Sequence, residues 1–108
     1  MMSQPENRLL MEFERLLREA NREAINPILD ALTLEQLKPM ARLVARARAA
    51  YLKQLHELAA QYDGTDQLPT EAEMLALSQQ RGRFLDLVEG SKSFETAIQR
   101  GYLDVKSR

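Results

Sequence analysis

The stretch from Thr33 to Tyr62 constrains the fold of this 108-residue chain more than any other. Its spacing in steps of three and four places the apolar side chains on one face of an α-helix, and the alanines between them favour helix strongly. Such a face has to be covered by neighbouring segments, so the stretch predicts a central helix near residues 39–62. The face consists of Met40, Leu43, Val44, Ala47, Tyr51, Leu55, Leu58 and Tyr62.

Two further stretches have the same periodicity and predict helices near residues 6–25 and 70–89, with short helices near 27–32 and 93–100. Short connections make neighbouring helices antiparallel. The sequence therefore predicts an all-α fold, a small antiparallel helical bundle with three main helices and two short ones. We expect residues 1–108 to form a single helical domain, with flexible ends at 1–4 and 104–108.

Local signals mark where these helices begin and end. Thr33 with Gln36, and Thr70 with Glu73, have the spacing of capping boxes, and Gly64 suits a left-handed helix end. Pro39 would remove a hydrogen bond inside a helix, so we expect a turn at residues 33–38 and regular helix from Pro39 onward. Gly90 is expected to close the third main helix, as glycine often does.

Composition limits the classes of protein that this chain can belong to. It has no cysteine, which excludes disulfides and thiolate metal sites, and no apolar run long enough to cross a bilayer. The N-terminus lacks the layout of a secretory signal, so a cytoplasmic protein is expected. Arginine outnumbers lysine, which is typical of GC-rich bacterial or phage genomes.

Charge is segregated along the chain although the formal net charge is only −1. The segment from Leu37 to His56 carries five bases and no acid, and the segment from Glu57 to Gln80 carries five acids and no base. Either segment is a candidate contact surface. We predict partner binding by the basic residues, which are Lys38, Arg42, Arg46, Arg48 and Lys53.

Catalytic arrangements are missing from the sequence, so we expect no enzyme activity, cofactor or metal. The chain has one histidine, no glycine-rich phosphate loop and no nucleophile–base pair. That histidine lies in His56-Glu57-Leu58, which resembles the core of the phospho-accepting box of sensor histidine kinases. The resemblance implies phosphotransfer at His56, although the usual continuation Arg-Thr-Pro is replaced by Ala59-Ala60-Gln61.

These features favour a non-enzymatic helical protein-interaction module, an adaptor, inhibitor or regulatory subunit that binds a partner protein or itself as a homodimer. Methionines on the apolar stripes, at Met11, Met40 and Met74, would suit a shared dimer surface. Nucleic-acid binding through the basic ridge of the central helix is the main alternative. Phosphotransfer at His56 is a lesser one, and no membrane association is expected.

Overall fold

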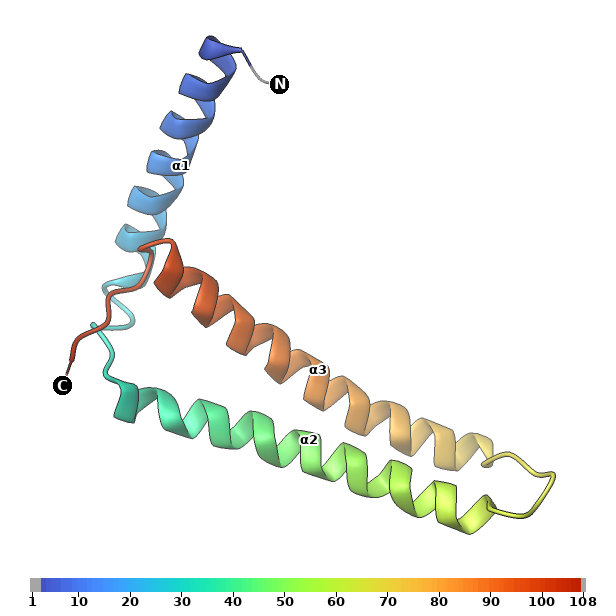
Figure 1. Cartoon of the computed structure of the whole chain (residues 1–108). Coiled ribbons are helices and arrows are strands. Elements are labelled where there is room, and N and C mark those ends of the chain that lie inside the picture. Colours follow the sequence, from blue (N-terminus) through green and yellow to red (C-terminus); the bar gives the residue numbers. More distant parts are fainter. Residues whose placement is uncertain (1–2, 108) are drawn as a thin grey trace. The chain divides into compact units, whose positions relative to one another are not determined.

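The structure is a computed structural model that describes residues 3–107. Within this range the chain forms three α-helices, α1 (Gln4–Ile25), α2 (Leu34–Tyr62) and α3 (Glu71–Gln99), and no β-strand (Figure 1). A single isolated bridge joins Leu32 to Val105. The prediction of an all-α fold is therefore confirmed.

Helix α1 begins in a capping box at Ser3, within the N-terminal end (residues 1–4) that the sequence predicts to be flexible. The Ser3 hydroxyl accepts from the backbone N–H of Glu6, while the Glu6 carboxylate accepts from the backbone N–H of Ser3. Pro5 stands in the first turn, where its missing N–H costs no hydrogen bond. After Ile25 the chain turns, and the short helix predicted for residues 27–32 is not among the described helices.

Helix α2 begins earlier than predicted. Thr33 and Gln36 form the expected capping box, with Gln36 Oε1 accepting from the Thr33 N–H at 2.9 Å. The helix then continues through Pro39, so the expected turn at residues 33–38 was wrong. Proline at this position removes only the bond to the Glu35 carbonyl, and the capped turn before it holds the helical backbone.

Helix α3 is longer than predicted. Its start matches the expected capping box, since the Glu73 carboxylate accepts from the Thr70 N–H at 2.9 Å. It does not end near residue 89; it runs through Gly90 and includes the segment expected to form a separate short helix at 93–100. The chain turns after Gln99, where Gly101 has a φ of 74°.

The helices are distributed over two compact units. Unit 1 combines Met1–Leu37 with Ser93–Arg108, and unit 2 is the continuous segment Lys38–Lys92. Packing of all three helices into one antiparallel bundle remains a prediction.

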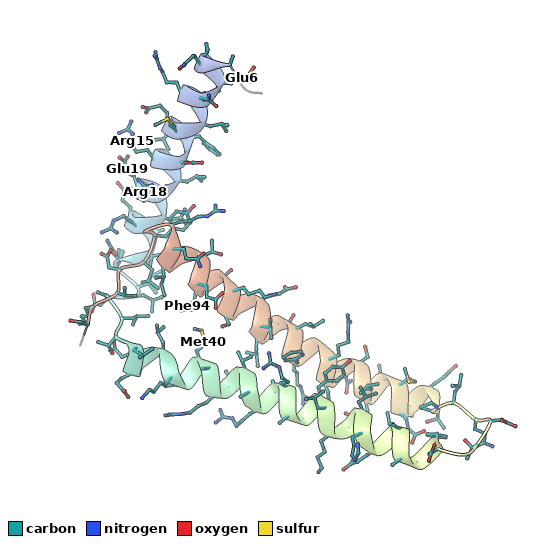
Figure 2. The ribbon with its side chains drawn as sticks, in the orientation of Figure 1. Glu6, Arg15, Arg18, Glu19, Met40 and Phe94 are labelled. Atoms are coloured by element: carbon teal, nitrogen blue, oxygen red, sulfur yellow. The ribbon has the colours of Figure 1, made fainter. Side chains whose placement is uncertain are left out.

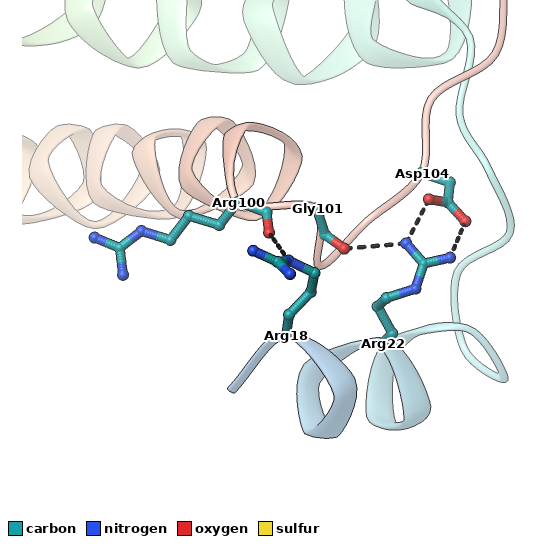
Figure 3. A network of polar contacts seen from close by, with 5 residues as sticks. All are labelled: Arg18, Arg22, Arg100, Gly101 and Asp104. Atoms are coloured by element: carbon teal, nitrogen blue, oxygen red, sulfur yellow. Dashed lines mark hydrogen bonds and ion pairs between the residues drawn. The ribbon is translucent and has the colours of Figure 1, made fainter. Parts of the chain in front are cut away.

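Unit 1 fixes the C-terminal segment against α1 (Figure 3). Both terminal nitrogens of Arg22 donate to the Asp104 carboxylate, at 2.6 and 2.8 Å, and one also donates to the Gly101 carbonyl at 3.0 Å. Leu103 beside them is almost fully enclosed. Of the residues expected to form flexible ends, Met1, Met2 and Arg108 lie outside the described part of the chain.

Unit 2 is an antiparallel helical hairpin, visible as the paired α2 and α3 ribbons in Figure 1. The Tyr51 and Phe84 rings stack with centroids 6.0 Å apart, and nearer the loop the Tyr62 hydroxyl donates to the Glu73 carboxylate. Gly64 in that loop has a φ of 74°, the left-handed conformation that the sequence predicted. Leu58, at 8% exposure, is the one buried side chain among the described residues of this unit.

Candidate protein-interaction surfaces

The apolar face of α1 is the largest uncovered helix face in unit 1. Leu9, Phe13 and Leu16 lie along it at helical spacing and remain 70, 54 and 56% exposed. The opposite end of α1 is where unit 1 packs, since Leu17, Asn21 and Ile25 are half-buried. The N-terminal half of the helix thus presents an apolar face that unit 1 itself does not cover.

Acidic side chains border this face. Glu12, Glu19 and Glu23 fall on one edge by helical spacing, and all are exposed. Arg15 lies beyond them and donates to Glu12 at 2.7 Å and to Glu19 at 3.4 Å. Figure 2 shows Arg15 and Glu19 on the same side of α1. Both ion pairs are exposed, so the carboxylates stay available to a partner at small cost.

The basic residues predicted to bind a partner divide into two groups on α2. Arg42 and Arg46 are exposed, and neither forms an ion pair within the part of the chain that the structure describes. Lys53 lies 3.7 Å from Glu57 in an exposed pair, and Lys38 is half-buried. Helical spacing places these four residues on the side of α2 that faces away from α3. They form a ridge, as the sequence suggested.

Arg48 does not belong to this ridge. Its guanidinium lies over the Phe84 ring, 5.1 Å from the centroid, and thereby covers the aromatic pair inside the hairpin. A cation over an aromatic face is an attractive contact that helps to hold α2 on α3. The structure thus gives Arg48 a contact within the hairpin.

A shallow groove of about 480 Å³ runs along one side of the hairpin. Its floor is apolar, and charged side chains stand at its rim. The groove is lined by Leu43, Arg46, Ala47, Ala50, Gln80, Arg83, Asp86 and Leu87. Arg46 therefore belongs both to the basic ridge and to the rim of this groove.

The acidic segment is partly engaged in structure. Glu73 accepts hydrogen bonds from Thr70 and Tyr62, and the bond from Tyr62 is the main reason that the pKa of Glu73 is lowered. The same bond raises the pKa of Tyr62, because ionisation of the phenol would remove the donor. Glu73 therefore forms the cap that its spacing from Thr70 predicted, and it also makes a hairpin contact with Tyr62 that the sequence did not reveal.

His56 and the carboxylates considered as catalytic or metal-binding residues do not gather into a site within the described residues. His56 is exposed on α2, and the neighbouring Glu57 is paired with Lys53. Among residues 3–107 no three metal-ligating side chains gather into a group that could hold an ion. None of the helices described combines the length and the apolar character needed to cross a membrane.

In comparisons with known proteins, no family model, curated protein or solved structure matches this chain. The fold defines it as a small all-α protein with amphipathic helices.

Proposed function

We propose that the chain is a non-enzymatic helical protein-interaction module, which acts as an adaptor, inhibitor or regulatory subunit. The observation that carries the proposal is the apolar face of α1, where Leu9, Phe13 and Leu16 are left open by unit 1. Contiguous exposed apolar side chains framed by charge are typical of protein-binding surfaces. A helix with such a face binds best to another apolar helix or to a groove.

The charged residues at the edge of the apolar face of α1 indicate the chemistry of the partner. The exposed carboxylates of Glu12, Glu19 and Glu23 favour a partner with lysine or arginine beside its own apolar stripe. We therefore propose that α1 binds an amphipathic helix with basic flanks. The apolar stripe supplies most of the affinity, and the charges select the partner and its orientation.

A designed peptide tests this proposal directly. The probe is a helical peptide with a leucine stripe flanked by lysines. The control peptide is identical except that glutamates replace the flanking lysines. We expect the lysine peptide to bind more tightly by fluorescence anisotropy, and Leu9→Glu with Phe13→Glu to weaken it at least about 10-fold.

Met11→Glu is the matched control, because Met11, contrary to its expected place on the apolar stripe, is exposed on the opposite side of the same helix. Equal loss of binding in Met11→Glu, or equal affinity for the two peptides, would argue against α1 as the binding surface.

The exposed ridge on α2 supports a second candidate function, nucleic-acid binding. Arg42, Arg46 and Lys53 could contact phosphates without reading sequence. We expect any such binding to weaken steeply with salt and to disappear when all three residues are changed to glutamate. A gel shift at low salt with no retained DNA or RNA would remove this candidate and leave an acidic protein as the partner for the ridge.

Phosphotransfer at His56 is the lesser candidate. His56 is exposed on a hairpin helix, which is where a phosphodonor could reach it. Acid-labile phosphate on the protein after incubation with a phosphodonor such as acetyl phosphate, absent in His56→Gln, would support it. Equal labelling of the two proteins would exclude it.

A further inference from the structure

The contact line between α2 and α3 is only partly formed by large apolar residues. Within unit 2 it follows alternating steps of three and four, as in a coiled coil, but polar or small side chains occupy nearly half of it. Along α2 it comprises Val44, Ala47, Tyr51, Gln54, Leu58 and Tyr62, and along α3 Glu73, Leu77, Gln80, Phe84, Leu87 and Ser91. A hairpin of this size with one enclosed leucine needs further burial to be stable.

Apolar side chains that this line does not use collect on one side of the hairpin. In an antiparallel pair, residues that follow a contact position by one or by four lie on the same side of both helices. Leu52, Leu55 and Met74 lie there and are 54, 44 and 48% exposed. Leu85 and Val88 lie beside them and are half-buried. We call these five residues the hairpin strip; it lies on the side opposite the groove.

The size of this side suits a second hairpin. Two helices of about 25 residues cover a face roughly 37 Å long and 20 Å wide, or about 740 Å² for each copy. Two such faces together bury about 1,500 Å², which is the area of a standard stable interface. A peptide or a single helix would leave about half of the hairpin strip open.

The charges of the hairpin bear on how two copies can be arranged. From Lys38 to Tyr62, α2 carries five bases and one acid, whereas from Glu71 to Lys92, α3 carries four acids and three bases. The α2 of one copy is therefore repelled by the α2 of another and meets far less repulsion from its α3.

We propose that unit 2 is a homodimerisation unit, in which two hairpins pack through the hairpin strip into an antiparallel four-helix bundle. The bundle that the sequence predicts for one chain is then completed by two. A two-fold axis permits either α2 against α2 with the loops at opposite ends, or α2 against α3 with the loops at the same end. The charges favour the second arrangement. This inference rests on the proposed function in one respect, since a second copy of the chain is one of the partners proposed there. The surface involved is the hairpin strip of unit 2 and not the apolar face of α1.

Sedimentation of the full chain tests the dimer. At about 100 μM, well above the micromolar to picomolar Kd range of interfaces of this area, we expect twice the 12.4 kDa chain mass. Leu55→Glu should reduce the mass to that of one chain while circular dichroism still shows the helices. Leu75→Glu, the same change on the exposed outer side of α3, should leave the dimer intact.

A wild-type chain that sediments as a monomer would overturn the proposal. So would a dimer that survives Leu55→Glu and Leu52→Glu, or one that is dissolved by Leu9→Glu on α1 instead. These outcomes are separate from the peptide assay, since loss of peptide binding with an intact dimer would count against the α1 surface alone.

The arrangement of the loops can be measured because the chain has no cysteine of its own. A spin label at Leu68→Cys, an exposed loop position, reports the distance between the two loops. Loops at the same end place the labels within about 30 Å, whereas loops at opposite ends separate them by about the hairpin length, 37 Å or more. The longer distance would contradict the pairing of α2 with α3 across the interface.

Discussion

Arg22 is the residue on which the C-terminal half of unit 1 depends. Its guanidinium binds Asp104 through two parallel bonds and the Gly101 carbonyl through a third, across a separation of about 80 positions in the sequence. Bidentate pairs of this kind are stronger and more specific than single ion pairs. The sequence could not predict it, because nothing near Arg22 or Asp104 distinguishes them from other charged residues.

The pairing with Arg22 makes unit 1 sensitive to acid. The hydrogen bond from Arg22 lowers the pKa of Asp104, so the pair stabilises the fold at pH values above the ordinary aspartate pKa of about 3.9. This contribution is lost as the pH falls through the lowered pKa. We expect Asp104→Asn to lower the thermal midpoint at pH 7, and the difference from wild type to shrink below about pH 4.

Circular dichroism melts between about pH 2 and 7 measure this difference. Asp66→Asn is the control, because Asp66 has no ion pair among the described residues. If the difference in thermal midpoint between wild type and Asp104→Asn stayed constant with pH, the charge of Asp104 would not be what stabilises the segment.

The hydrogen bond between Tyr62 and Glu73 makes the stability of unit 2 depend on pH at the loop end of the hairpin. Their hydrogen bond raises the pKa of Tyr62 and lowers that of Glu73, so it stabilises the hairpin between the two ordinary values of about 4.3 and 10. It is lost as the pH rises through the raised tyrosine pKa or falls through the lowered glutamate pKa. NMR titration of the Tyr62 ring carbon should show its pKa returning toward 10 in Glu73→Gln, which keeps the Thr70 cap; an unchanged value would refute the contact.

The helices show which parts of the fold can be predicted from the sequence. Both predicted capping boxes formed, because each depends on residues three positions apart. The breaks expected at Pro39 and Gly90 did not form, because each residue costs a helix only one bond or some backbone entropy. Phe84, Leu87, Phe94 and Ile98 keep one helical phase across Gly90, with the polar Ser91 between Leu87 and Phe94, and this phase was the better guide to α3.

Gly90 offers a direct measure of that backbone cost. It lies inside α3, and a Cβ placed there would meet no atom within 4 Å. We therefore expect Gly90→Ala to raise the free energy of unfolding by about 0.5–1 kcal/mol in urea denaturation, because alanine restricts the unfolded chain and strains nothing. Gly101→Ala is the opposing control, since its φ of 74° disfavours alanine; a gain there as well would contradict this explanation.

At the level of the whole molecule, sequence periodicity identified apolar faces but not which of them a single chain covers. Leu9 and Leu58 fit the same pattern, yet Leu9 is open and Leu58 is enclosed. Burial depends on contacts between distant segments, which spacing along one helix does not encode. Helical spacing already set Arg48 apart from the other basic residues, and the structure adds the contact that occupies it, the Phe84 ring on α3.

Self-association through unit 2 would link stability to protein concentration. A dimer that unfolds to two chains gains stability by mass action, so we expect a 100-fold increase in concentration to raise the thermal midpoint on the order of 5 °C. Scanning calorimetry at two concentrations measures this shift. Leu55→Glu should melt at the same temperature at both concentrations, and a wild-type midpoint that did not move would argue against a dimer.

Unit 1 is assembled from two stretches of chain with the whole of unit 2 between them. During synthesis the hairpin is complete once Lys92 has emerged from the ribosome, whereas the contact of Arg22 on α1 with Asp104 can form only after Asp104 has followed. Until then α1 of the nascent chain lacks this contact. Premature termination shortly before Leu103 would leave that helix permanently without its clamp and make the product a substrate for chaperones and proteases.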